Sequence, residues 1–150
     1  MKIKFLVLPA IFTGVSLIGQ TFSAEAQLAF VPTCTLSTLN SSYGAQATGT
    51  LVSPPAPFTS GIFGETGLVS FSGDGKFGGN DTVSFNGTII TRTFRGNYTV
   101  QPDCTASFTF TDNFGNSATA NGVIVNNGKK VIVIQTVPTG TVITGSFEKL

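Results

Sequence analysis

The sequence contains no histidine and no tryptophan, and only 10% of its residues are charged. The absence of imidazole excludes Ser-His-Asp and Cys-His catalysis, and it excludes metal sites that need histidine ligands. The absence of tryptophan leaves few aromatic platforms of the kind that hold sugars. No catalytic constellation is recognisable among the remaining residue types, so the sequence favours a protein that is not an enzyme. We expect no metal and no other cofactor.

The sequence also lacks any concentration of charge of one sign. Lysine and arginine together number 8, aspartate and glutamate number 7, and the two signs are interspersed along the chain. Nucleic-acid binding requires a basic surface that neutralises phosphates, and docking on an anionic membrane requires a basic segment. Neither feature is present, so we expect no nucleic-acid partner.

Residues 1–26 have the pattern of a secretory signal peptide. Two lysines precede an apolar run over residues 5–18, and Ala24-Glu25-Ala26 matches the small-residue pattern of a cleavage site. An uncleaved membrane anchor is the alternative, but the apolar run is shorter than the roughly 20 residues that cross a bilayer. We therefore predict cleavage after residue 26 and export to the periplasm or the extracellular space, without stable membrane insertion of the mature chain.

What the sequence does have is abundant phenylalanine, valine, isoleucine and threonine, with glycine and asparagine between them. Aromatic and β-branched residues favour strands, whereas long runs of alanine, leucine, glutamate and lysine, which favour helices, are absent. The composition predicts an all-β protein. We assign residues 27–42 to an irregular N-terminal segment with one short helical turn, and residues 43–150 to a single β-barrel domain.

Three segments show the period of two that is typical of half-buried strands. Their apolar faces consist of Val83, Phe85 and Ile89, then Phe94, Tyr98 and Val100, then Ala106, Phe108 and Phe110. The opposite face of each segment is mostly threonine, serine or asparagine. Each segment is therefore expected to place one face in a core and the other in solvent.

Turn signals separate the strand-like segments at short intervals. These signals are rich in glycine, asparagine and proline and comprise residues 54–57, 73–75, 78–81, 101–103, 113–116, 126–128 and 138–140. The spacing predicts seven to nine strands in an antiparallel meander. Closure into a small up-and-down β-barrel of about eight strands removes exposed edges, and a β-sandwich is the alternative. Residues 131–134 are apolar on both faces, so we expect another segment, such as the N-terminal one, to cover their outer face.

Cys34 and Cys104 are the two cysteines of the chain. In an exported protein the compartment favours oxidation, so the two cysteines are expected to form a disulfide. The bridge would join the irregular N-terminal segment to the start of the strand that contains Ala106. A reactive thiol is the alternative, although no histidine is present to activate it.

The acidic residues beyond the signal peptide mostly fall in apparent turns, where solubility explains them. Residues 78–83 resemble one fragment of the glycine- and aspartate-rich calcium repeats, to which Asp74 would add an oxygen ligand. Those repeats bind calcium in stacked copies, so we expect a polar hairpin loop instead. Arg92 shares the face of Phe94, where it would need a carboxylate or a ligand anion unless it is solvated near the strand end.

Residues 96–105, Gly-Asn-Tyr-Thr-Val-Gln-Pro-Asp-Cys-Thr, resemble a segment of small exported bacterial proteins of unknown function. In those proteins a G-x-Y-x-V-x-P-D-C-T run is paired with an N-terminal cysteine followed by a Tyr-Gly pair, which Cys34 and Tyr43-Gly44 match. The resemblance implies a calycin-like or allene-oxide-cyclase-like β-barrel and supports pairing of the cysteines. It implies no catalytic residues, because the group has no assigned activity.

The expected barrel leads to three hypotheses of function. The first is an exported, non-enzymatic barrel that binds a small apolar or amphipathic ligand, since barrels of about eight strands hold one small molecule. The residues expected to line its interior are Phe85, Arg92, Phe94, Tyr98, Phe108 and Phe110. The second is a structural or adhesive surface module whose barrel is filled by its own phenylalanines. The third is a cyclase or isomerase that acts through shape and a single carboxylate, with Glu65 and Asp103 as the residues to test.

Overall fold

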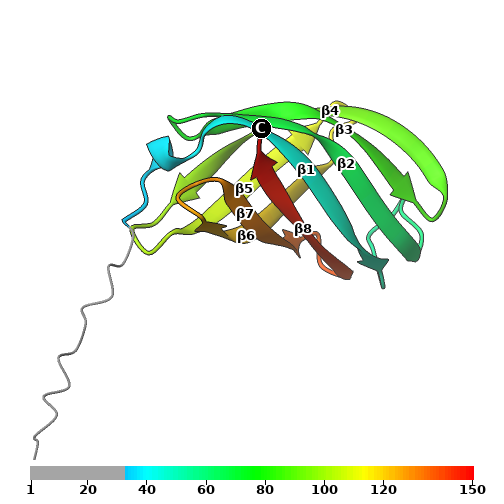
Figure 1. Cartoon of the computed structure of the whole chain (residues 1–150). Helices are drawn as coiled ribbons and strands as arrows, with labels where there is room; N and C mark the ends of the chain where they lie inside the picture. The colour runs from blue at the N-terminus through cyan, green and yellow to red at the C-terminus, as the bar shows by residue number, and fades with distance from the viewer. Residues whose placement is uncertain (1–32) are drawn as a thin grey trace, which may run out of the picture.

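Eight antiparallel strands close into an up-and-down barrel in which each strand pairs with the next and β8 pairs with β1 (Figure 1). This computed structural model describes residues 33–150, so the predicted signal peptide and residues 27–32 lie outside the described residues. The elements are η1 (Leu36–Thr38), β1 (Asn40–Leu51), β2 (Gly61–Ser72), β3 (Lys76–Phe85), β4 (Thr88–Val100), β5 (Thr105–Asp112), β6 (Ser117–Val125), β7 (Lys130–Val137) and β8 (Thr141–Lys149). The barrel is confirmed and the sandwich is excluded.

Alternation predicted the inward face correctly for the strands before and after the β4–β5 turn. Tyr98 and Phe108 are buried in the interior, with exposed fractions of 3% and 1%. The prediction was wrong for Ile89, which lies on the outside and is 64% exposed. Asn86 and Gly87 adopt left-handed backbone angles, with φ of 47° and 89°, and form the β3–β4 turn. This turn resets the alternation between Phe85 and Ile89.

The predicted turns all lie between strands, except residues 78–81, which lie within β3. The glycines of that segment allow close approach between strands and do not form a turn. A Cβ on Gly79 would lie 1.9 Å from the carbonyl oxygen of Leu68 on β2, so no larger residue fits at this point of the paired strands β2 and β3. Close approach of coiled strands, rather than a turn, therefore explains this glycine pair.

Up-and-down connectivity gives the barrel two different ends. The N-terminal segment and the β2–β3, β4–β5 and β6–β7 connections lie at one end, which we call the disulfide end. The β1–β2, β3–β4, β5–β6 and β7–β8 connections lie at the other, which we call the cavity end. Cross-contacts agree with this grouping, since the backbone N–H groups of Val52 and Ser53 both donate to the carbonyl oxygen of Gly140.

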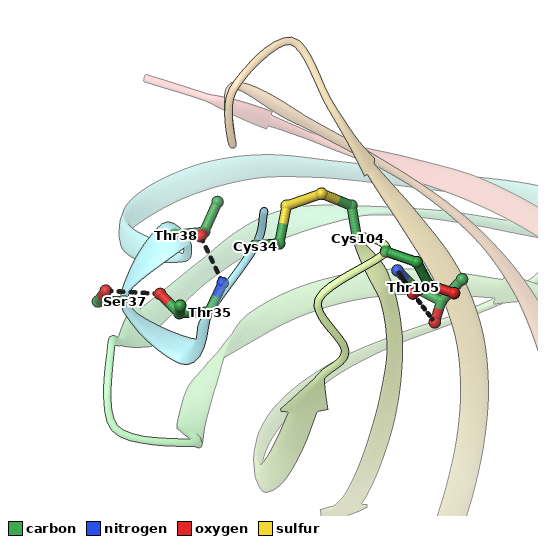
Figure 2. The surroundings of a disulfide bond; sticks show 7 residues. Cys34, Thr35, Ser37, Thr38, Cys104 and Thr105 are labelled. Carbon is green, nitrogen blue, oxygen red and sulfur yellow. Dashed lines mark hydrogen bonds between the residues drawn. A yellow bond between two sulfur atoms is a disulfide. The ribbon is translucent and has the colours of Figure 1, made fainter. Parts of the chain in front are cut away.

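The disulfide end is closed by the N-terminal segment. Cys34 is bonded to Cys104 in the β4–β5 turn, which confirms the predicted pairing, and η1 follows directly (Figure 2). The Tyr98 hydroxyl is placed 2.9 Å from the carbonyl oxygens of both Leu36 and Leu39 and donates to them from inside the barrel. A bridge of this kind is typical of proteins from oxidising compartments.

Glycine is required where the β6–β7 turn packs under η1. A Cβ on Gly128 would lie 2.5 Å from the carbonyl oxygen of Thr38, and the backbone φ of 80° also disfavours other residues. The carbonyl oxygen of Gly128 accepts a 2.6 Å hydrogen bond from the buried Tyr43 hydroxyl. The turn, the N-terminal segment and the core are thus held together at one point.

Two separate apolar clusters fill the interior. The cluster at the disulfide end is aromatic, with ring contacts among Tyr43, Phe71, Phe77, Tyr98, Phe108 and Phe147. The cluster at the cavity end is smaller and consists of Leu51, Phe63, Val83 and Ile143, with Phe58 and Phe85 packed against it. A layer of charged side chains lies between them and is described below.

The outer face of β7 is not covered by the described part of the N-terminal segment. Ile132 and Ile134 are about half exposed, and residues 33–39 lie over the disulfide end instead. Coverage by residues 27–32 falls outside the described residues. Within residues 33–150 no helix is long and apolar enough to cross a membrane.

Breaking the disulfide is expected to lower the free energy of unfolding by about 4 kcal/mol, because the bond joins residues 70 apart in sequence. Urea unfolding of oxidised and reduced protein measures the effect without changing Cys104, which has a left-handed φ of 69°. The Cys34→Ala, Cys104→Ala double variant is the control and should not respond to reductant. Equal stability of the oxidised and reduced protein would contradict the prediction.

Candidate functional site

Four charged side chains from neighbouring strands form one layer across the barrel interior. Glu65 comes from the middle of β2, Asp81 from β3, Arg92 from β4 and Asp112 from the end of β5. Asp81 and Arg92 are paired in the β3–β4 register, so their side chains leave the sheet side by side. We call these four residues the charged layer.

Arg92 is held mainly by Asp81. Its Nε donates to one carboxylate oxygen of Asp81 at 3.0 Å and its Nη2 to the other at 2.6 Å, which is the strong two-point geometry of guanidinium and carboxylate. Nη2 also lies 3.4 Å from Glu65, and Nη1 lies 3.6 Å from Asp112. The carboxylate partners of Arg92 therefore come from the protein, and no ligand anion is needed.

Asp112 has a second role as the anchor of the β5–β6 turn. One carboxylate oxygen of Asp112 accepts hydrogen bonds from the backbone N–H groups of Phe114 and Asn116, each at 2.9 Å. The Asn116 amide donates to the other oxygen at 3.1 Å. Asp112 thus fixes a turn at the cavity end and places its charge beside Arg92 at the same time.

Glu65 is the least satisfied member of the charged layer. Burial, then the nearby charge of Asp81, raise the pKa of Glu65 to about 7, and the charge of Arg92 only partly opposes them. A hydrogen bond with Asp81 also favours the protonated form of Glu65. The Glu65 side chain is 19% exposed, compared with 2% for Asp81 and 1% for Asp112. Glu65 can therefore exchange a proton near neutral pH.

The charged layer carries more negative than positive groups. Burial alone would lower the pKa of Arg92, but the hydrogen bond and charge of Asp81 and the charges of Glu65 and Asp112 raise it. Arg92 is therefore a permanent cation that faces three carboxyl groups. An additional anion would be repelled here, whereas a hydrogen-bond donor or a cation would be attracted.

A small cavity lies between the charged layer and the cavity end of the barrel. Its volume is about 70 Å³, and Glu65 and Arg92 form its floor. The walls are mainly apolar side chains from strands and loops, namely Leu51, Pro54, Phe58, Phe63, Phe85, Phe110, Ala118, Pro138 and Ile143. Such a combination of apolar walls and a few convergent polar groups is typical of small-molecule sites.

The six residues proposed as a ligand-binding interior all face inward but belong to two regions. Phe85, Arg92 and Phe110 line the cavity. Tyr98 and Phe108 are packed in the aromatic cluster at the disulfide end, and Phe94 packs against that cluster. The half of the interior at the disulfide end is therefore filled by aromatic side chains, and the cavity lies in the other half.

Sequence reasoning missed the charged layer, because it assigned most acidic residues to turns and named Glu65 only as a carboxylate to test for catalysis. That assignment is wrong for Glu65 and Asp81, which lie within strands, and for Asp112, which faces the interior. The positions of these acidic residues relative to the phenylalanines of the same strand could have shown that their side chains face inward. Each acidic residue lies an even number of positions from inward-facing phenylalanines of the same strand, for example Asp112 from Phe108 and Phe110.

Other parts of the described chain are weaker candidates for a ligand-binding or catalytic site. A hollow of about 910 Å³ lies along β4 and β5, but it is lined largely by outward-facing residues such as Thr93, Arg95 and Thr109. Asp103, the other carboxyl group considered for catalysis, lies in the β4–β5 turn at the disulfide end and accepts hydrogen bonds from Thr105. Within residues 33–150 no group of three or more acidic or cysteine side chains is arranged to hold a metal ion.

Comparison with known structures finds a similar barrel. The fold is similar to that of a redesigned β-barrel, mFAP1, whose structure was solved with DFHBI bound. The two chains are 15% identical, the match covers 77% of this chain and 98% of the other, and the TM-score is 0.57. This likeness shows the fold alone. No protein-family model matches the chain, and no curated protein matches it, so the resemblance carried by residues 96–105 stays a prediction.

Ionisation of Glu65 is expected to make the protein less stable as pH rises. The pKa is about 7 in the folded protein and 4.5 in its ordinary state, so the folded form binds the proton more tightly. Its contribution is complete below pH 4.5 and is lost as pH rises through 7, an effect of about 3 kcal/mol. Urea unfolding at pH 5 and pH 8 should show this loss, and Glu65→Gln should remove it.

The matched control for this prediction is Glu148→Gln, which changes an exposed carboxylate paired with Lys130. That variant should keep the pH dependence of the wild-type protein. If Glu65→Gln loses as much stability between pH 5 and pH 8 as the wild type, Glu65 does not titrate as described.

Removal of the Arg92 charge is expected to be strongly destabilising. Arg92→Met leaves Asp81 and Asp112 buried without their cation, so the free energy of unfolding at pH 7 should fall by about 3–5 kcal/mol. Arg95→Met, which changes an outward-facing residue of the same strand, is the control and should have little effect. A loss in Arg92→Met no larger than in Arg95→Met would contradict the prediction.

Proposed function

We propose that this protein is an exported, non-enzymatic barrel that binds a small amphipathic molecule at the cavity end, in the periplasm or outside the cell. The observation that carries the proposal is the cavity itself, with apolar walls above a floor formed by Glu65 and Arg92. The opposite half of the interior is filled and sealed by the disulfide-linked segment. Ligand entry is therefore assigned to the cavity end.

The apolar part of the ligand would pack among Phe58, Phe63 and Phe85. A volume of about 70 Å³ holds a few water molecules, so a larger ligand requires one wall to move. Phe58 is the wall residue best placed to move, because it lies in the β1–β2 loop outside the strands and packs on Phe85 with ring centroids 5.1 Å apart. A ligand that displaces Phe58 would replace this ring contact with its own.

The polar part of the ligand would be a hydroxyl or an amine rather than an acid. Arg92 already donates two hydrogen bonds to Asp81. The contact between Arg92 and Glu65 is longer, at 3.4 Å. Glu65 is therefore the group with free hydrogen-bonding capacity, and the excess of carboxyl groups repels anions. The similar barrel mFAP1 was solved with DFHBI bound, which supports the general idea that a barrel of this fold can hold a small molecule.

The test compares three probes that share one apolar chain: hexylamine, 1-hexanol and hexanoate. Calorimetric titration of the purified protein at pH 8 should show that the amine and the alcohol bind, with hexanoate at least about tenfold weaker. Ala118→Phe should block binding by filling the cavity, and Phe58→Ala should strengthen it. Thr91→Phe, which adds the same ring to the outer face of β4, is the matched control.

The outcomes separate the two hypotheses left open for the interior. Binding that is lost in Ala118→Phe and kept in Thr91→Phe supports the cavity as the site. Absence of binding by all three probes, in the wild type and in Phe58→Ala, would favour the structural module instead. Tightest binding of hexanoate would contradict the assignment of Glu65 as the recognition group.

A further inference from the structure

The cavity end of the barrel carries no charged residue in any of its connections. The connecting segments at this end, residues 52–60, 86–87, 113–116 and 138–140, contain no lysine, arginine, aspartate or glutamate. Outside the charged layer, the charged residues of the described chain are Asp74, Lys76, Arg95, Asp103, Lys129, Lys130, Glu148 and Lys149. All of these except Arg95 lie in or beside the connections of the disulfide end, so charge is segregated along the barrel axis.

Large apolar side chains are exposed at this same uncharged end. Six of them have exposed fractions between 48% and 68%, and we call them the apolar collar: Val52, Ile62, Ile89, Phe114, Val137 and Val142. Single exposed apolar residues are ordinary in soluble proteins, but a contiguous group marks an interaction surface.

The collar runs around the whole mouth of the barrel. Val52 and Ile62 flank the β1–β2 loop, Ile89 begins β4, and Phe114 lies in the β5–β6 turn. Val137 and Val142 flank the β7–β8 connection, which is beside β1 in the closed barrel. Each of the four connections at the cavity end therefore has at least one collar residue within or beside it.

A ring of this kind fits a lipid surface. Moving charged groups from water into the bilayer interface is costly, and the connections at this end have none to move. Apolar side chains at the end of an otherwise polar domain enter the boundary between headgroups and acyl chains, and their buried area sets the strength of binding. A fluid lipid surface can also follow a ring with a hollow at its centre, whereas a folded partner would need a matching projection.

We propose that the cavity end docks on a lipid surface, with the apolar collar inserted at the headgroup boundary and the barrel axis steep to the membrane. The proposal rests on the collar and the segregation of charge, and it does not depend on ligand binding in the cavity. Docked in this way, the mouth faces the acyl chains, so an amphipathic molecule would pass between membrane and cavity without crossing water.

The test is co-sedimentation of residues 27–150 with vesicles of phosphatidylcholine, alone or mixed with phosphatidylserine. We expect equal binding to both vesicle types and no loss at high salt, because the connections that form the docking surface are uncharged. Ile62→Asp and Val142→Asp should each weaken partitioning about tenfold or more. Ile62→Trp should strengthen it, because tryptophan favours the interface.

Two controls keep the result specific. Ile132→Asp places the same charge on an exposed apolar position of the barrel wall and should bind like the wild type. Ala118→Phe, which fills the cavity, should also bind vesicles normally, so failure of the ligand proposal leaves this one intact. Circular dichroism and an intact disulfide verify that each variant is folded.

Three outcomes would overturn the proposal. The first is no binding of the wild-type protein to phosphatidylcholine. The second is binding that requires phosphatidylserine and is abolished by salt, which would assign docking to the lysines of the disulfide end. The third is a concentration-dependent dimer that Ile62→Asp dissociates while vesicles remain unbound, which would assign the collar to a second copy of this chain.

Discussion

The guanidinium of Arg92 lies among carboxyl groups from three other strands, and this grouping sets the character of the whole interior. A cation inside a barrel of this size is tolerated only because Asp81 engages it at two points and Glu65 and Asp112 supply further negative charge. Since each member comes from a different strand, the charged layer aligns β2 to β5 at one height. The aromatic cluster packs on one side of the layer, and the cavity opens on the other.

The half of the barrel at the disulfide end is the more strongly held, and the half at the cavity end is the more accessible. At the disulfide end a covalent bond, two buried tyrosine hydroxyls and an aromatic cluster hold the N-terminal segment over the strands. At the cavity end the apolar cluster is small, the loops are uncharged, and the pKa of Glu65 is raised to about 7. Sites that bind and release ligands are drawn from the less stable parts of a fold, and the strongly held half allows the other half to stay open.

The architecture could be predicted from the sequence because its signals are local. Alternation in the Phe94 and Phe108 segments, and glycine- or asparagine-rich turns, are enough to indicate a closed meander of about eight strands. The pairing of Cys34 with Cys104 followed from their number and from the expected compartment. Ile89 was misassigned because the turn at Asn86 and Gly87 shifts the alternation of inward and outward side chains. Residues 78–81 were misassigned because their glycines permit close approach of paired strands and do not form a turn.

The candidate site was harder to predict because it depends on register between strands. Glu65, Asp81 and Asp112 are in phase with inward phenylalanines of their own strands, yet nothing local shows that they meet Arg92 at one height. The same limit applies to Tyr98 and Phe108, which alternation places inside without showing that they belong to the filled half. Separation of a packed half from a hollow half appears only when side chains from all eight strands are placed together.

Closure of the barrel brings the first and last strands together, and the even number of antiparallel strands places both described ends of the chain on one side. Cys34 is bonded beside the β4–β5 turn, and the backbone N–H of Leu150 donates to Ser42 at the start of β1 (Figure 1). Attachment to a bead, a chip or a fused protein through Leu150 would therefore hold the barrel by its sealed base. The cavity end would then point away from the support and into the solution, and this orientation follows from the strand topology alone.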